Sequence, residues 1–133
     1  MIYLDTSALV KLVRVEAESL ALSRWLAARS TEMPIASSLV DVEIRRALRR
    51  SHPEALPAID DVLAHVARVA ISAAVRDRAA VTGPPGLRTL DAIHLATAEF
   101  LVSAGQRITA FITYDERLGG SARAAGFELA APR

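Results

Sequence analysis

The sequence predicts an α/β domain built on a mostly parallel sheet of about five strands that is flanked by helices. Three observations support this class. Short apolar runs, rich in Ile and Val or ended by Gly and Pro, alternate with longer stretches of helical periodicity. The 133 residues suit a single domain that buries roughly two-thirds of the surface its unfolded chain exposes. Apolar residues make up 52% of the chain, a globular rather than a disordered composition.

The predicted strands are short, and helical stretches separate them. The strands are 2–5 (IYLD), 34–37 (PIAS), 66–71 (VARVAI), 108–113 (ITAFIT) and 127–129 (FEL). The helices are 6–14, 17–29, 38–50, 54–64, 73–81, 89–104 and 116–125. The clearest loop is 82–88, with two prolines between two glycines, and Thr89 is the expected N-cap of the next helix.

Composition excludes several functional classes. The chain has no Cys, so it has no disulfide and no thiolate metal site. Its formal net charge of +1 gives no overall attraction for polyanions, so contact with nucleic acid requires a local basic patch. No leader pattern opens the sequence, and no apolar run approaches the ~18 residues of a membrane span. We therefore expect a cytoplasmic protein without membrane contact.

Two acids stand where predicted strands end. Asp5 closes the first strand, and Asp115 follows the strand that ends at Thr113. Functional groups gather at the carboxyl ends of parallel strands, so both acids are expected at one edge of the sheet. Each acid could instead be only the N-cap of the helix that follows it. Capping explains each one separately, but it does not explain why several acids should gather beside one sheet.

The predicted helix 38–50 carries one acid on its apolar side. At about 100° per residue, its apolar positions cover an arc of roughly 180°. Glu43 falls at about 40°, inside that arc, whereas Asp41 falls at about 200°, at the boundary with solvent. Glu43 is therefore a candidate functional acid. The alternative is an ion pair with Arg46 or Arg50 on the same helix.

The predicted helix 89–104 holds an acid and a histidine in apolar surroundings. Asp91 lies in the first turn, where the helix dipole alone favours an acid. The helix is apolar nearly all round, so we expect it to be buried on most sides, with Asp91 facing an internal cleft. His94 shares that face, and we expect it to be a hydrogen-bonded core residue rather than a metal ligand.

Carboxylates gathered at one place repel each other. At a separation of ~5 Å and an effective dielectric constant of ~20, each pair costs about 3 kcal/mol. Such a group takes up protons or surrounds a cation. Oxygen ligands without Cys suit Mg²⁺ or Mn²⁺, which support phosphoryl chemistry. The residues alone therefore predict an acidic metal site on an α/β sheet.

Four stretches are distinctive in combination: YLDTSALVKL, SSLVDVEIRRALRR, LRTLDAIHLATA and FITYDERL. Together they resemble the PIN-domain ribonucleases, in particular the VapC toxins of bacterial toxin–antitoxin pairs. Their order and spacing match over essentially the whole chain. We therefore expect one PIN-like domain over residues 1–133.

The resemblance implies that four acids surround one cavity that binds Mg²⁺, with Mn²⁺ able to substitute: Asp5, Glu43, Asp91 and Asp115. Asp5 and Asp91 would be the principal ligands, and the other two would complete the set directly or through water. The hydroxyls of Ser7 and Thr113 would orient the water shell of the metal or a substrate phosphate. The implied reaction is hydrolysis of RNA by water, which leaves 5′-phosphate and 3′-hydroxyl ends.

A basic stripe and a pair of helices are candidate contact surfaces. The stripe lies opposite the apolar arc of helix 38–50 and consists of Arg45, Arg46, Arg49 and Arg50. We expect some of these arginines to contact RNA phosphates, and a solvated helix face is the alternative. The resemblance also implies a homodimer and a VapB-like antitoxin that contacts the first two helices near Trp25. Core packing is the alternative role for that tryptophan.

Three other assignments are weaker. A receiver domain would have an acidic pair near its start and a late lysine, but the only lysine is Lys11. A haloacid-dehalogenase-like enzyme would have an acid two residues after Asp5, where Ser7 stands. A catalytically degenerate PIN domain that only binds RNA or protein would have no reason to keep four mutually repelling acids.

Overall fold

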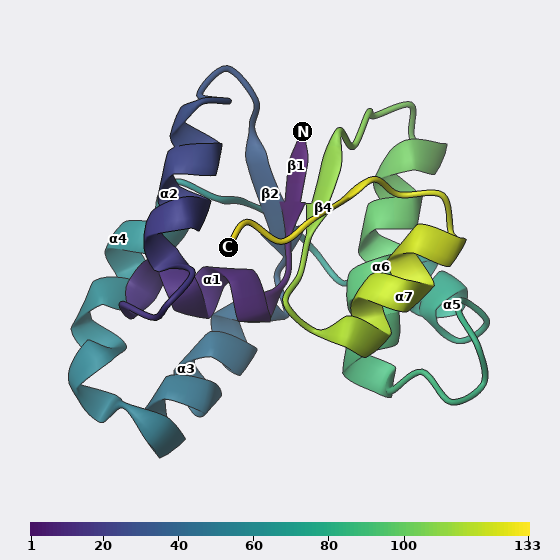
Figure 1. Cartoon of the computed structure of the whole chain (residues 1–133). Coiled ribbons are helices and arrows are strands. Elements are labelled where there is room, and N and C mark those ends of the chain that lie inside the picture. The colour runs from purple at the N-terminus through teal and green to yellow at the C-terminus, as the bar shows by residue number, and fades with distance from the viewer.

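Five short strands form one sheet in the computed structural model, which describes residues 1–133 (Figure 1). The strands are β1 (Ile2–Leu4), β2 (Pro34–Ser37), β3 (Ala67–Val69), β4 (Ala110–Ile112) and β5 (Leu129–Ala130). Their order across the sheet is β3-β2-β1-β4-β5, and every neighbouring pair is parallel. The predicted α/β class is confirmed, and β1 is the central strand.

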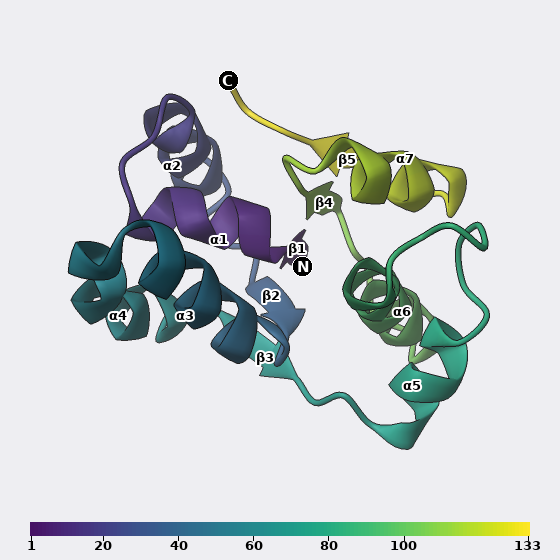
Figure 2. The same cartoon turned by 90° about the horizontal axis from the view of Figure 1, so that it is seen from below.

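Helices cover both faces of the sheet. They are α1 (Thr6–Val13), α2 (Ser19–Ala27), α3 (Val40–Ser51), the 3-10 helix η1 (Pro53–Ala58), α4 (Ile59–Leu63), α5 (Ala73–Ala79), α6 (Thr89–Ser103) and α7 (Glu116–Ala124). Figure 2 shows α1 to α4 on one side of the strands and α5 to α7 on the other. No helix is long and apolar enough to cross a membrane.

The central strand divides the apolar core into two clusters, because successive side chains of a strand point to opposite faces. Ile2 and Leu4 belong to the cluster shared with α1, α2, α3 and α4. Tyr3 belongs to the other cluster, where it stacks on Phe111 of β4 and is joined by Leu95 of α6. The three residues before Asp5 are therefore fully packed, and they fix the place of that acid.

Most predicted helix ends differ from the structure by one or two residues, and two predictions fail for an identifiable local reason. The predicted helix 54–64 is instead η1 followed by α4, because Pro57 has no N–H with which to continue an α-helical ladder. Thr89 is the first residue of α6, and the N-cap position belongs to Arg88, whose side chain makes no capping bond. The prediction that Thr89 is the N-cap was therefore wrong.

The last strand begins later than the predicted 127–129. The Phe127 N–H bonds to the Ala122 carbonyl, and the Gly126 N–H bonds to the Arg123 carbonyl. Gly126 has a φ of 91°, so this pair of bonds closes the end of α7 with a left-handed glycine. Because these residues terminate the helix, β5 begins only at Leu129.

The chain reverses its direction across the sheet beside β1. It passes from β1 to β2 and β3 on one side, and then crosses to β4 and β5 on the other. In parallel α/β sheets, ligands bind at the carboxyl ends of the strands next to such a reversal. Asp5 follows β1 directly, and Thr113 follows β4 directly. The fold therefore places both residues at the expected binding edge.

Candidate active site

Asp5 is held by three hydrogen bonds at the junction of β1 and α1. Its Oδ1 accepts from the Ala8 N–H at 2.9 Å and from the Ser7 hydroxyl at 2.6 Å. Its Oδ2 accepts from the Thr113 hydroxyl at 2.6 Å. The predicted N-cap is therefore confirmed, yet Asp5 is only 3% exposed. Burial raises the pKa of this carboxyl above its ordinary value, although all three hydrogen bonds favour the ionised form.

The two hydroxyls that contact Asp5 also connect it to the chain after β4. Ser7 Oγ accepts from the Tyr114 N–H at 2.8 Å, and Thr113 Oγ1 accepts from the Asp115 N–H at 3.0 Å. Asp115 in turn caps α7, where its Oδ1 accepts from the Leu118 N–H at 2.9 Å. The Thr113 hydroxyl therefore links the Asp5 carboxylate to the backbone of Asp115.

Glu43 approaches the same region from α3. Its Oε1 accepts from the Thr6 hydroxyl at 2.7 Å and lies 2.7 Å from His94 Nε2. The alternative of an intrahelical pair with Arg46 or Arg50 is not found. Burial would raise the pKa of Glu43, but its interaction with His94 and the hydrogen bond from Thr6 outweigh burial, so its pKa is lowered.

His94 is a buried, hydrogen-bonded residue, as predicted. It is 3% exposed, and its Nδ1 lies 3.0 Å from the Tyr3 hydroxyl. Tyr3 was not among the residues predicted from the sequence. The signal was present, because a tyrosine inside an aliphatic buried strand needs a partner for its hydroxyl.

Asp91 on α6 has a carboxylate oxygen without a hydrogen bond. Its Oδ2 is buried and unpartnered, and Arg88 Nε lies 3.4 Å away, an ion-pair distance without hydrogen-bond geometry. Arg88 Nη2 also lies 3.6 Å from Asp115 Oδ2, so one guanidinium stands between two carboxylates. Burial and the nearby charge of Asp115 raise the pKa of Asp91 above its ordinary value.

The structure thus gathers the four predicted acids from four elements at one edge of the sheet. No three carboxylate or imidazole side chains stand close enough to hold a metal ion directly. Mg²⁺, however, usually keeps several waters and binds one or two carboxylates. Three features fit such a hydrated ion: Asp91 Oδ2 lacks a hydrogen bond, the pKa values of Asp5 and Asp91 are raised, and every donor is an oxygen.

Comparison with known proteins identifies the family. The sequence pattern that defines the PIN domain matches residues 2–123. The chain belongs to the PIN-domain family. Ribonuclease VapC35 of Mycobacterium tuberculosis is 50% identical over 132 residues, which are 99% of this chain and 97% of that protein. Ribonuclease VapC46 of the same species is 41% identical over 131 residues, which are 98% of this chain and 97% of the relative. The chain is thus a VapC-type PIN domain.

Solved structures have the same fold. The crystal structure of Mycobacterium tuberculosis VapC20, described as a sarcin–ricin loop cleaving toxin, matches with a TM-score of 0.71 and 23% identity. That match covers 99% of this chain and all of VapC20. The VapBC2 structure from Rickettsia felis, bound to a fragment of its promoter DNA, matches over both full chains with a TM-score of 0.71 and 14% identity.

The arginine stripe of this PIN domain has two different sides. Arg46, Arg49 and Arg50 line a hollow of about 510 Å³ together with Glu43 and Leu90. Arg45 does not line that hollow. Its guanidinium lies 2.6 Å from Asp60 Oδ1 and donates to the Asp41 carbonyl at 2.8 Å. Three of the four arginines therefore share a surface with a candidate catalytic acid, and one is engaged elsewhere.

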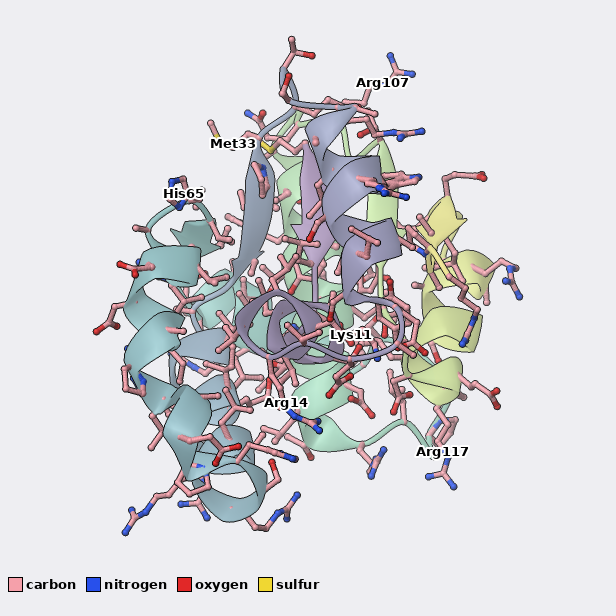
Figure 3. The ribbon with its side chains drawn as sticks, turned by 60° about the vertical axis from the view of Figure 1, so that its left-hand side comes forward. Lys11, Arg14, Met33, His65, Arg107 and Arg117 are labelled. Carbon is pink, nitrogen blue, oxygen red and sulfur yellow. The ribbon has the colours of Figure 1, made fainter.

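The single lysine lies outside the acid cluster. Lys11 Nζ is 2.8 Å from Glu16 Oε2 and 2.8 Å from Glu18 Oε2. Figure 3 shows Lys11 and Arg14 near the end of α1, far from Met33 and Arg107 at the other end of the strands. Burial alone would lower the pKa of Lys11, but the carboxylates of Glu16 and Glu18 outweigh burial, so its pKa is raised. Lys11 is therefore a permanent cation that joins α1 to the following segment.

Proposed function

We propose that this VapC-type PIN domain is a metal-dependent endoribonuclease and the toxin of a VapBC-type pair. The observation that carries the proposal is the gathering of Asp5, Glu43, Asp91 and Asp115 at the reversal point of the sheet, with Asp91 Oδ2 left without a hydrogen bond. Capping accounts for Asp5 and Asp115, but it does not explain why Glu43 and Asp91 lie in the same region. The VapC ribonucleases that match over nearly the full length support the same function.

In this proposal, Asp5 and Asp91 hold Mg²⁺, or Mn²⁺ in its place, and Glu43 and Asp115 complete the acidic set directly or through water. The bound cation would lower the pKa of a water molecule and stabilise charge on the phosphate and on the leaving 3′ oxygen. Ser7 and Thr113 hold the Asp5 carboxylate in one orientation through their hydrogen bonds. The products carry 5′-phosphate and 3′-hydroxyl ends.

The hollow beside Glu43 is the proposed path of the RNA backbone. Arg46, Arg49 and Arg50 line it, and guanidinium groups bind phosphates by paired hydrogen bonds. Arg45 is not assigned this role, because its guanidinium is engaged by Asp60 and by the Asp41 carbonyl. The overall charge of +1 makes this local patch necessary for RNA binding.

The proposed protein partner is a VapB-like antitoxin that docks on the α1–α2 surface of a homodimer. Val15 is 90% exposed and Leu20 is 61% exposed, so this corner presents apolar side chains to solvent. Trp25 on α2 packs against the core on one side and carries the Arg29 guanidinium 3.7 Å from its ring centroid. The VapBC2 structure, in which a chain of the same fold occurs with its antitoxin, is consistent with this partner.

A second candidate is a catalytically degenerate PIN domain that binds RNA or protein without cleaving it. The observation that favours it is the absence of any three acids close enough to hold a metal ion directly. Direct measurement of metal affinity separates the two candidates.

The deciding experiment incubates the partner-free protein with mixed cellular RNA and Mg²⁺ or Mn²⁺, in parallel with EDTA and with Asp5→Asn. Asparagine preserves an N-cap oxygen, so α1 should still form. We expect EDTA to abolish cleavage and Asp5→Asn to lower its rate by about 100-fold or more. Asp77→Asn, an exposed acid on α5, is the matched control and should leave cleavage unchanged.

Three other results would contradict parts of this proposal. Cleavage that survives Asp5→Asn would refute the assigned site. Products with 2′,3′-cyclic phosphate ends would refute hydrolysis by water, because they show attack by the ribose. Folded protein that neither cleaves RNA nor binds Mn²⁺ would favour the binding module.

A further inference from the structure

Three polar side chains from three elements are joined in one row of hydrogen bonds, and two of them are buried. The Tyr3 hydroxyl of β1 lies 3.0 Å from Nδ1 of His94 on α6. Nε2 of that imidazole lies 2.7 Å from Oε1 of Glu43 on α3. Tyr3 is 0% exposed and His94 is 3% exposed. Burying such groups is costly unless they are hydrogen-bonded, so this row is a specified feature of the core.

For a neutral His94, one arrangement of protons satisfies these hydrogen bonds. The Tyr3 oxygen accepts the Ser37 backbone N–H at 3.3 Å, and its own proton is left to donate to His94 Nδ1. A neutral imidazole that accepts at Nδ1 carries its proton on Nε2. That proton points at Glu43 Oε1, so the histidine donates to the carboxylate. The opposite tautomer would bring two acceptors together at 2.7 Å.

The second donor to Glu43 strengthens this orientation. The Thr6 hydroxyl donates to the same Oε1 at 2.7 Å, so one oxygen receives both hydrogen bonds. The other carboxylate oxygen of Glu43, Oε2, makes no hydrogen bond with the rest of the protein. Glu43 also lines the hollow that holds the three arginines. The carboxylate is thus anchored by one oxygen, and the other remains available to the site.

We propose that His94 is a positioning residue for the acidic site: Tyr3 holds it in a single tautomer, and it fixes the Glu43 carboxylate so that only Oε2 is free to act. The inference deepens the proposed function and rests on it, since it explains how one of the four acids is oriented. It assigns roles to two residues, Tyr3 and His94, that do not themselves touch the reacting atoms. A histidine that donates to a functional carboxylate in this way commonly sets both its direction and its basicity.

The test compares Mn²⁺ affinity, measured from the free-ion electron paramagnetic resonance signal, across variants of this row. His94→Leu removes the donor, whereas His94→Gln places an amide N–H near the former Nε2. We expect His94→Leu to weaken Mn²⁺ binding about 10- to 100-fold and His94→Gln to restore most of it. Tyr3→Phe should weaken binding by a smaller factor, because the tautomer is no longer enforced. His65→Leu, at an exposed histidine, is the matched control and should bind as the wild type does.

Nitrogen NMR of the metal-free wild type provides a readout that does not depend on metal binding or on the stability of any variant. The inference predicts that the His94 ring is protonated at Nε2 and accepts a hydrogen bond at Nδ1, and that Tyr3→Phe produces a mixture of tautomers. Protonation at Nδ1 alone in the wild type would overturn the inference, as would a folded His94→Leu protein with unchanged Mn²⁺ affinity.

The two proposals fail in different ways. A wild-type protein that binds Mn²⁺ while His94→Leu binds it equally well removes the positioning role and leaves the proposed function standing. A wild-type protein without Mn²⁺ binding refutes the metal-dependent function, and the positioning role for that site falls with it.

Discussion

Asp5 is at once a helix cap and a member of the acidic site. A serine or asparagine would cap α1 equally well, so capping does not require the charge. The charge is retained in a place where burial opposes ionisation and raises the pKa. The two explanations that the sequence left open for Asp5 are therefore compatible, and the same holds for Asp115, which caps α7 beside Asp91.

Arg88 is the residue whose position the sequence could not suggest. It stands 3.4 Å from Asp91 and 3.6 Å from Asp115, in the place that a cation between these acids would take. We predict that Arg88→Gln lowers the stability of the metal-free protein by less than about 1 kcal/mol, because the guanidinium is largely exposed. Mn²⁺ binding should tighten about two- to fivefold, since the ion no longer displaces a competing cation.

Calorimetric titration with Mn²⁺ checks this expectation, and Arg76→Gln on α5 is a suitable control because that guanidinium bonds to the Ile71 carbonyl and not to an acid. Weaker binding in Arg88→Gln would mean that the guanidinium remains beside the carboxylates when the metal is bound and assists it.

Among the helices, α3 shows what helical periodicity can predict from the sequence and what it cannot. The position of Glu43 on the apolar side and of Asp41 at the solvent boundary follows from 3.6-residue periodicity, and the structure agrees with both. Its partners Thr6 and His94 lie 37 and 51 residues away in the sequence. Periodicity identifies the face of a helix that is buried, but not the element that covers that face.

The two sides of the arginine stripe on α3 give a matched prediction. We expect Arg49→Ala and Arg50→Ala to weaken RNA binding and to make its salt dependence shallower, by about 0.7 in the log–log slope for each phosphate that is no longer neutralised. Arg45→Ala should leave the slope unchanged, because that side chain pairs with Asp60. Binding of an uncleaved RNA to Asp5→Asn protein at several salt concentrations measures these slopes. Equal slopes for all three variants would mean that the stripe is only a solvated face.

Helix α6 follows the sequence prediction closely. Its nearly continuous apolar surface indicated burial on most sides, and the structure buries seven of its 15 residues: Ala92, His94, Leu95, Ala96, Thr97, Ala98 and Leu101. The first turn remains at the sheet edge, which is why Asp91 reaches the site while the middle of the helix packs in the core. The N-cap prediction failed by one residue because Arg88, and not Thr89, precedes the first helical residue.

For the whole molecule, the acids couple folding stability to pH and to metal. The pKa values of Asp5 and Asp91 are raised in the folded state, so the folded chain binds these protons more tightly than the unfolded chain. Their contribution to metal-free stability therefore grows as the pH falls through the raised pKa values, and it is complete below the ordinary value of 3.8. The lowered pKa of Glu43 acts oppositely, but only below its ordinary value of 4.5.

We predict that metal-free protein becomes more stable as the pH falls through the raised pKa values of Asp5 and Asp91, and that Mn²⁺-saturated protein becomes less stable. The ion binds ionised carboxylates, so its stabilisation, about 2.7 kcal/mol at a concentration of 100 times Kd, disappears as they are protonated. Urea unfolding across a pH series with and without Mn²⁺ measures both slopes. Asp5→Asn should flatten each of them, and parallel slopes in the two series would contradict the coupling.

Sequence by itself determined the parallel α/β class, the approximate elements, and the positions of four acids at strand ends and on two helix faces. These features depend on local periodicity, capping chemistry and the rule that parallel strands share a carboxyl edge, all of which are visible within short windows. The family resemblance added the expectation that the acids belong together.

Only the tertiary structure decided which groups meet. The contacts from Tyr3 through His94 to Glu43, the placement of Arg88 beside Asp115, and the pairing of Arg45 with Asp60 all join residues on different elements. Such contacts depend on how helices pack across the reversal of strand order beside β1. No pattern along the chain encodes that packing, because it follows from the simultaneous burial of both faces of one sheet.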